Sequence, residues 1–275
     1  MWVFLHMRKI LFIVFLTLFY ACNNNQDQSV QPKANVQYPS YVTGLLKEID
    51  RFPDSADLRV QLVDTMDSLN LTKDALSQID SLIARDPGNY GVWFRKGELA
   101  IKMADTALAI KSFSSAEKIY SNPDVVLTIA NLYAAQKNKL ALELCNRIIT
   151  QKPDRTYIAH SYYIMGLYFG NTGNTKNAID NFNYCIQNNY FYIDAYMEIG
   201  WIYFDQQKFE KAKAVFETAI AIKPTEAAPH YWQAKCFEKL GQSKEALNAY
   251  QLAFNLDNSL REAAEAISRI KATKK

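Results

Sequence analysis

Histidine serves both proton transfer and metal binding, and this chain of 275 residues contains only three. They are His6, His160 and His230, and they lie far apart in the sequence. His160 and His230 could face one groove, but we do not expect them to bind a metal. The chain also lacks HExxH, GxSxG and a phosphate-binding glycine loop. The sequence therefore predicts a protein that is not an enzyme, with no cofactor and no metal.

Three cysteines, Cys145, Cys185 and Cys236, fall within apolar helical segments. They show no CxxC spacing, so neither a zinc site nor a redox pair is indicated. We expect them to be small buried apolar residues.

The fourth cysteine, Cys22, follows a short basic and apolar segment. Arg8 and Lys9 precede an apolar run over 10–21, which is too short to span a membrane and suits a signal peptide. The join of Ala21 and Cys22 resembles the lipobox of bacterial lipoproteins, although the residues at 19 and 20 are bulkier than that motif usually has. An ordinary signal peptide with an incidental cysteine is the alternative.

The lipoprotein resemblance implies a lipid anchor at Cys22 and a place in the bacterial cell envelope. Within this resemblance, Asn23 rather than aspartate after the cysteine favours delivery to the outer membrane, where we expect the protein to face the periplasm. Residues 1–21 are then the signal peptide. Residues 22–40 are rich in Asn and Gln and are expected to form a disordered tether.

The net charge of +3 is small. Without Arg8 and Lys9, 29 basic residues stand against 28 acidic ones, a balance of +1. A nucleic-acid partner is not expected, because such proteins usually carry a basic stripe.

An apolar pattern at helical spacing recurs through most of the chain. A small residue of the second helix in each copy recurs about every 34 residues, at Ala75, Ala109, Ala141, Ala178, Ala212 and Ala246. The first helix of each copy has its own position, here called the small site, occupied by Gly97, Ala130, Gly166, Gly200 and Ala234; only the first copy departs from it, with Val63. A small side chain there allows two helices to cross closely, and the residue four after each alanine, bulky in every copy but the third, fills the remaining space.

This pattern resembles the tetratricopeptide repeat. The resemblance implies an all-α, right-handed superhelical solenoid of about six helix-turn-helix repeats, with capping helices at its ends. We place the repeats at 56–89, 90–123, 124–158, 159–192, 193–226 and 227–260, with an N-terminal capping helix in 41–55 and a C-terminal capping helix and tail in 261–275.

Two departures from the repeat are visible. The third repeat is one residue shorter between its helices. Extra residues at Asp154–Tyr157 predict a loop that protrudes between the third and fourth repeats.

In the resembled family the first helices line a concave groove that binds a protein or peptide. The groove positions lie three residues before the small site, and one and four after it. Those expected to contact a partner are Phe94, Asn131, Tyr163, Met197, Trp201, Phe204, Tyr231 and Lys235.

Two functions are compatible with these residues. Exposed aromatic rings would anchor a protein partner of an envelope scaffold that assists assembly or secretion. The same rings could stack on sugars, so a glycan- or peptidoglycan-binding lipoprotein is the alternative. The rings could also pack against neighbouring helices and leave little surface for any ligand.

Overall fold

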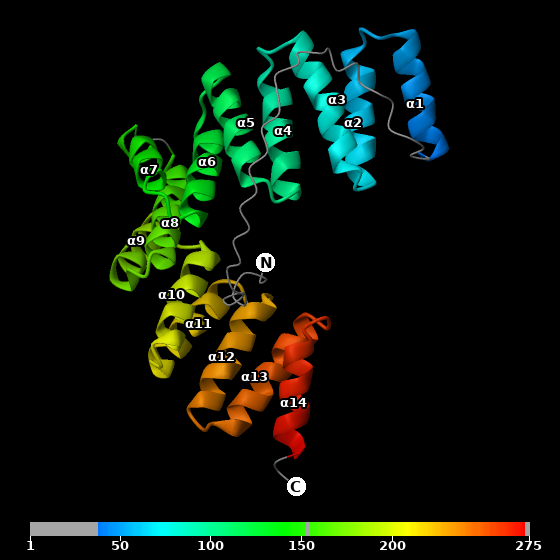
Figure 1. Ribbon diagram of the computed structural model, residues 1–275. Helices are drawn as coiled ribbons and strands as arrows, with labels where there is room; N and C mark the ends of the chain where they lie inside the picture. The colour runs from blue at the N-terminus through cyan, green and yellow to red at the C-terminus, as the bar shows by residue number, and fades with distance from the viewer. Residues whose placement is uncertain (1–37, 152–153, 273–275) are drawn as a thin grey trace, which may run out of the picture. The chain divides into compact units, whose positions relative to one another are not determined.

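The computed structural model describes residues 38–151 and 154–272, and within these ranges the chain forms helices and no strand (Figure 1). Cys22 and the predicted signal peptide lie outside the described residues. The helices are α1 (Ser40–Arg51), α2 (Ala56–Ser68), α3 (Thr72–Arg85), α4 (Tyr90–Lys102), α5 (Thr106–Ile119), α6 (Pro123–Ala135), α7 (Leu140–Thr150), α8 (Arg155–Asn171), α9 (Thr175–Asn188), α10 (Ile193–Asp205), α11 (Phe209–Ile222), α12 (Ala227–Lys239), α13 (Ser243–Leu256) and α14 (Arg261–Ala272).

From α2 onward the helices pair as six antiparallel hairpins, α2 with α3 through to α12 with α13, and each hairpin packs on the next (Figure 1). α14 packs on α13 and buries Ala263, Ala266 and Ile270. α1 buries Val42 and Ile49. The predicted all-α solenoid of helical hairpins is confirmed. None of the described helices is long and apolar enough to cross a membrane.

The turn inside each hairpin contains one residue with a positive φ, always seven positions after the small site. These residues are Asn70, Ala104, Lys137, Gly173, Gln207 and Gly241. The left-handed conformation ends the first helix in each case, and only two of the six positions use glycine, which adopts it without strain. Because the third hairpin keeps this spacing, its missing residue lies between Lys137 and Ala141, which are four positions apart where the other hairpins have five.

The small sites have the function that the sequence predicts. A Cβ atom added to Gly97, Gly166 or Gly200 would lie 2.4–2.6 Å from ring carbons of a phenylalanine in the second helix of the same hairpin. These phenylalanines, Phe113, Phe182 and Phe216, are at most 1% exposed. The glycines therefore make room for the largest side chains between the helices.

The loop expected at Asp154–Tyr157 is not present. Asp154 is the N-cap of α8, accepting a hydrogen bond from the backbone N–H of Thr156 (2.8 Å), and the helix begins at Arg155. The extra residues lengthen α8 to 17 residues, whereas α2, α4, α6, α10 and α12 have 13. A capping aspartate followed by residues without proline or glycine favours this helical start over a loop.

Candidate partner-binding groove

Contacts between successive first helices follow one register. Arg95 of α4, two positions before its small site, meets Asp64 and Asp67 of α2, at 31 and 28 residues' separation. At the same separations, Trp232 of α12 meets Trp201 and Phe204 of α10. In both cases the side chain two positions before the small site of one repeat lies against two side chains of the preceding repeat. Those two side chains come one and four positions after the small site of their own repeat. We call each such contact region between successive first helices a joint.

The joint between α2 and α4 is occupied by matched charges. The Arg95 guanidinium lies 3.1 Å from Asp64, 2.9 Å from Asp67 and 3.2 Å from Glu98. Lys102 Nζ is 2.7 Å from Asp67 Oδ1, and its hydrogen bond lowers the pKa of Asp67. The acidic residues of this end of the groove therefore already have cations of the same chain as partners.

The joint between α10 and α12 is aromatic. We define the ring cluster as Trp201, Phe204, Tyr231 and Trp232. The rings of Trp201, Phe204 and Tyr231 lie edge-on to Trp232, with centroids 5.4–5.9 Å away, and Trp232 stacks on buried Phe216. All four rings are partly buried. Packing against neighbouring helices, which was the alternative to partner binding, therefore covers part of each ring, and the remaining surface is accessible to a partner.

Lys235 lies over the ring cluster. Its Nζ is 4.6 Å from the centroid of Trp232 and 5.7 Å from those of Phe204 and Tyr231. Three ring faces attract the ammonium, as in a cation–π site. No carboxylate of the described residues pairs with Lys235. Its charge is held in place and remains available to a carboxylate of a partner.

The structure places the other predicted groove residues in different surroundings. Met197 is 4% exposed, so most of its side chain is packed and only a small part borders the groove. Tyr163 is partly buried and packs against Tyr192 and Phe182, at centroid distances of 4.9 and 5.7 Å. Phe94 packs against Phe113. The eight predicted residues therefore do not form one patch: the structure brings together Trp201, Phe204, Tyr231 and Lys235.

Asn131 is exposed and lines a hollow of about 320 Å³ between α6 and α8. Asp124, Tyr157 and His160 line it as well, and the Tyr157 hydroxyl donates to Asp124 Oδ2 at 3.3 Å. The N-terminal extension of α8 supplies Tyr157 and so builds one wall of the hollow.

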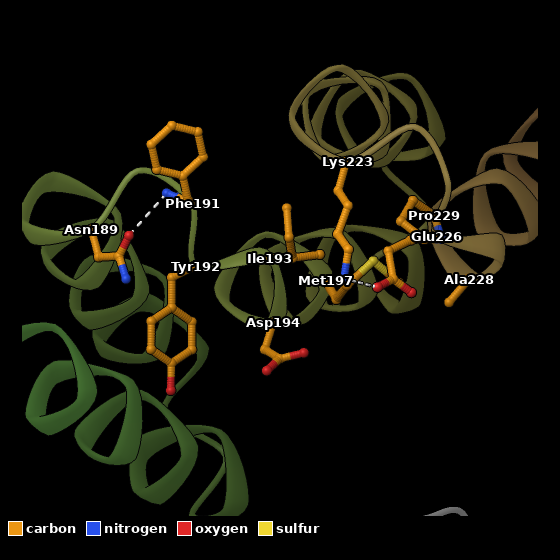
Figure 2. A pocket seen from close by; sticks show the side chains of 10 residues that line it. All are labelled: Asn189, Phe191, Tyr192, Ile193, Asp194, Met197, Lys223, Glu226, Ala228 and Pro229. Carbon is orange, nitrogen blue, oxygen red and sulfur yellow. Dashed lines mark hydrogen bonds and ion pairs between the residues drawn. The ribbon is translucent and has the colours of Figure 1, made fainter. Parts of the chain in front are cut away.

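A second hollow, of about 480 Å³, lies over the start of α10 (Figure 2). Ile193 and Met197 contribute its apolar side, and Lys223 and Glu226 form an ion pair at its edge. Figure 2 shows Asp194 directed away from that ion pair and Phe191 pointing outward. Phe191 is 73% exposed.

The two histidines among the described residues, His160 and His230, each make a hydrogen bond within the fold. His160 Nδ1 and the Tyr192 hydroxyl are 2.7 Å apart, and His230 Nε2 lies 2.9 Å from the carbonyl oxygen of Pro224. No cluster of three or more metal-binding side chains occurs in the part of the chain that the structure describes. Cys145, Cys185 and Cys236 are free and fully buried, and burial raises the pKa of each thiol to about 12.

Sequence reasoning missed two residues of this face. Trp232 is the centre of the ring cluster, and Glu198 lies two positions before the small site of α10. Both occupy the position of Arg95, which the expected groove pattern did not include. The joint register is the signal that identifies them.

Comparison with known proteins supports the repeat assignment. Models of the tetratricopeptide repeat match residues 193–226 and 230–256. Two Arabidopsis thaliana proteins described as uncharacterized and TPR repeat-containing are each 32% identical over 66 residues. This match covers 24% of the chain but only 8% of either relative.

Solved structures share the fold at low sequence identity. A tetratricopeptide repeat protein from Parabacteroides merdae has a TM-score of 0.61 at 15% identity, over 84% of this chain and 91% of that one. PilW, described as a type IV pilus biogenesis factor, has a TM-score of 0.59 at 13% identity, over 78% and 97% of the two chains. The repeat pattern, the hairpin stack and these matches agree: the chain is a tetratricopeptide-repeat protein.

Proposed function

We propose that this protein is a non-catalytic scaffold that binds a protein or peptide in the groove of its first helices, with the ring cluster and Lys235 as the main anchor. The observation that carries the proposal is the position of Lys235, held over three rings without a carboxylate of the described residues to pair with. Repeat packing alone does not require a cation there, since the same position in α10 holds Trp201.

The composition of the anchor suits a protein partner. Tryptophan and tyrosine dominate the binding energy of many protein interfaces, particularly where they are partly shielded from water. A carboxylate of the partner would find at Lys235 an ammonium already oriented by the rings, so little side-chain entropy would be lost on binding. An apolar side chain of the partner would extend the ring cluster.

The test is a crosslinked pull-down from membranes that compares wild type with Trp201→Ala, Phe204→Ala and Lys235→Met. Each is expected to reduce recovery of the partner by about tenfold or more, as at interface hot spots. Lys235→Met keeps an aliphatic chain over the rings and removes only the charge. Tyr184→Ala, an exposed ring on α9, is the control and should not change recovery. Unchanged protein partners, together with lost retention on peptidoglycan, would overturn the scaffold in favour of a glycan-binding role.

We also propose that Cys22 carries a lipid that anchors the protein in the bacterial cell envelope, at the outer membrane facing the periplasm. The basic and apolar segment before Cys22 and the polar tether after it support this location. The tether would hold the repeat array away from the bilayer.

Replacing Cys22 with serine is expected to move the protein from the membrane fraction to the soluble fraction. Each buried methylene of an acyl chain contributes about 0.8 kcal/mol, so loss of the chains removes the anchor. Fractionation followed by immunoblotting measures the change, and Asn24→Ser in the same segment is the matched control. A Cys22→Ser variant that still sediments with membranes would contradict the anchor.

A further inference from the structure

The joint between α8 and α10 lacks the complementary partner seen in the two joints described above. Extending to α10 the register that brings Arg95 to Asp64 and Asp67 aligns Glu198 with Leu167 and Gly170, at the same separations of 31 and 28 residues. Leu167 is apolar, and Gly170 has no side chain. In the joint with Arg95, these two positions hold the carboxylates that neutralise the cation.

Space is available in front of Glu198. A Cβ atom built on Gly170 would have no neighbour within 4 Å, so the surface there is open. No lysine or arginine of the described residues forms an ion pair with Glu198. The helix that carries Glu198, α10, contains no basic residue at all.

Glu198 is nevertheless partly withdrawn from water. Burial, with the charge of Asp194 one turn earlier on α10, raises the pKa of Glu198 to about 7. Burial raises the pKa of the Tyr163 hydroxyl of α8, and the nearby charges of Glu198 and Asp194 raise it further. The joint thus combines two carboxylates with tyrosine rings, and no lysine or arginine of the described residues pairs with Glu198 there.

We infer that the joint between α8 and α10 is the docking place for a lysine or arginine side chain of the protein partner, in a groove whose walls are otherwise apolar and aromatic. This inference rests on the proposed function and names the chemistry of the partner. The argument is charge complementarity: the acidic side is fixed in the groove and the basic side is missing. Arg95 shows that a joint of this geometry accommodates a guanidinium between two helices.

The surroundings of the joint suit a cation on an extended segment. Tyr163 and Tyr192, whose ring centroids are 4.9 Å apart, add aromatic surface beside the carboxylates, and aromatic rings attract an ammonium or guanidinium. The hollow of Figure 2 begins at Asp194 and is lined by Ile193 and Met197, so an apolar residue next to the basic one has a place to bind. A partner would present a basic residue here and an acidic one to Lys235.

The test uses the full-length protein and three pools of end-blocked peptides of about nine residues, a length typical of groove-bound segments. The pools are degenerate except for a central arginine, glutamine or glutamate, and binding is measured by fluorescence anisotropy. Wild type is expected to bind the arginine pool at least about tenfold more tightly than the glutamine pool. Glu198→Gln should reduce this preference to less than about twofold. Glu217→Gln, which removes an exposed acid of α11, should keep the preference.

A second variant supplies the missing cation from the chain itself. Gly170→Arg places a guanidinium opposite Glu198, mirroring the pair of Arg95 and Asp67. It should abolish the preference for the arginine pool and lower the pKa of Glu198 as measured by NMR titration.

Equal binding of the arginine and glutamine pools by wild type would overturn the inference. If Trp201→Ala still removed that unselective binding, the proposed peptide-binding function of the groove would be supported even though the preference for a basic residue was wrong. Absence of binding by any pool would contradict both the peptide-binding function and the inferred preference for a basic residue.

Discussion

Replacing Phe216 with alanine is expected to lower the free energy of unfolding by about 3–5 kcal/mol. The ring is fully buried and fills the space directly above Gly200. Its other face stacks on Trp232, with centroids 6.2 Å apart and an interplanar angle of 27°. The substitution therefore leaves a cavity within the fifth repeat and also removes the ring on which Trp232, the centre of the ring cluster, is stacked.

Urea unfolding followed by circular dichroism measures the loss. Phe191→Ala is the matched control, because this ring is 73% exposed and its removal should change stability by less than about 0.5 kcal/mol. Since each repeat contacts mainly its neighbours, the loss should be local. Hydrogen exchange is expected to accelerate in α10–α13 more than in α2–α5. If Phe216→Ala and Phe191→Ala changed the free energy of unfolding equally, the prediction would be wrong, because the protein would then fill the space above Gly200 without losing stability.

The repeat positions could be predicted because helix crossing fixes them. A glycine in one helix and a large ring in the other is a local solution to close approach, and it recurs at Gly97, Gly166 and Gly200. Where the partner is not phenylalanine, the small site is not glycine: Ala130 corresponds to Cys145, and Ala234 to Tyr250. Both members of each pair lie in one hairpin, so the sequence alone shows the match.

The groove was less predictable, because its contacts join different hairpins. That Asp64 and Asp67 are paired with Arg95 depends on how far one hairpin is rotated against the next. The same rotation buries Met197 and places Trp232, which the expected pattern left out, at the centre of the ring cluster. Once one joint is known, however, its register applies to the others, and Glu198 is identified in this way.

The prediction for α8 was wrong for a related reason. An alignment of repeats shows where residues are inserted but not which conformation they adopt. Asp154 caps the helix, so the inserted residues extend α8 instead of forming a loop. Tyr157 then reaches Asp124 of the preceding repeat and contributes to the groove.

Replacing Gly200 with alanine is expected to lower the free energy of unfolding, although alanine favours helices by about 1 kcal/mol over glycine. The added Cβ atom would lie 2.4 Å from Cε1 of Phe216, so the ring must move within a packed core, at a cost of about 1–3 kcal/mol. Gly170→Ala is the control, because nothing lies within 4 Å of a Cβ atom there. It should leave stability unchanged or increase it by up to about 1 kcal/mol.

A double substitution distinguishes overpacking from other effects of the methyl group. If the clash with Phe216 is the cause, Gly200→Ala should cost much less in a Phe216→Leu background, and the two effects should be non-additive by about 1 kcal/mol or more. The sixth repeat shows why the ring must move: Ala234 is accommodated there with Tyr250, whose hydroxyl donates to Glu238 at 2.9 Å. Phe216 has no hydroxyl to hold it in such a position, and its stacking on Trp232 opposes the shift. Additive effects in the double variant would contradict the explanation that Gly200 is needed to avoid a clash with Phe216. They would also contradict the inference that the close crossing of the two helices sets the position of the ring cluster.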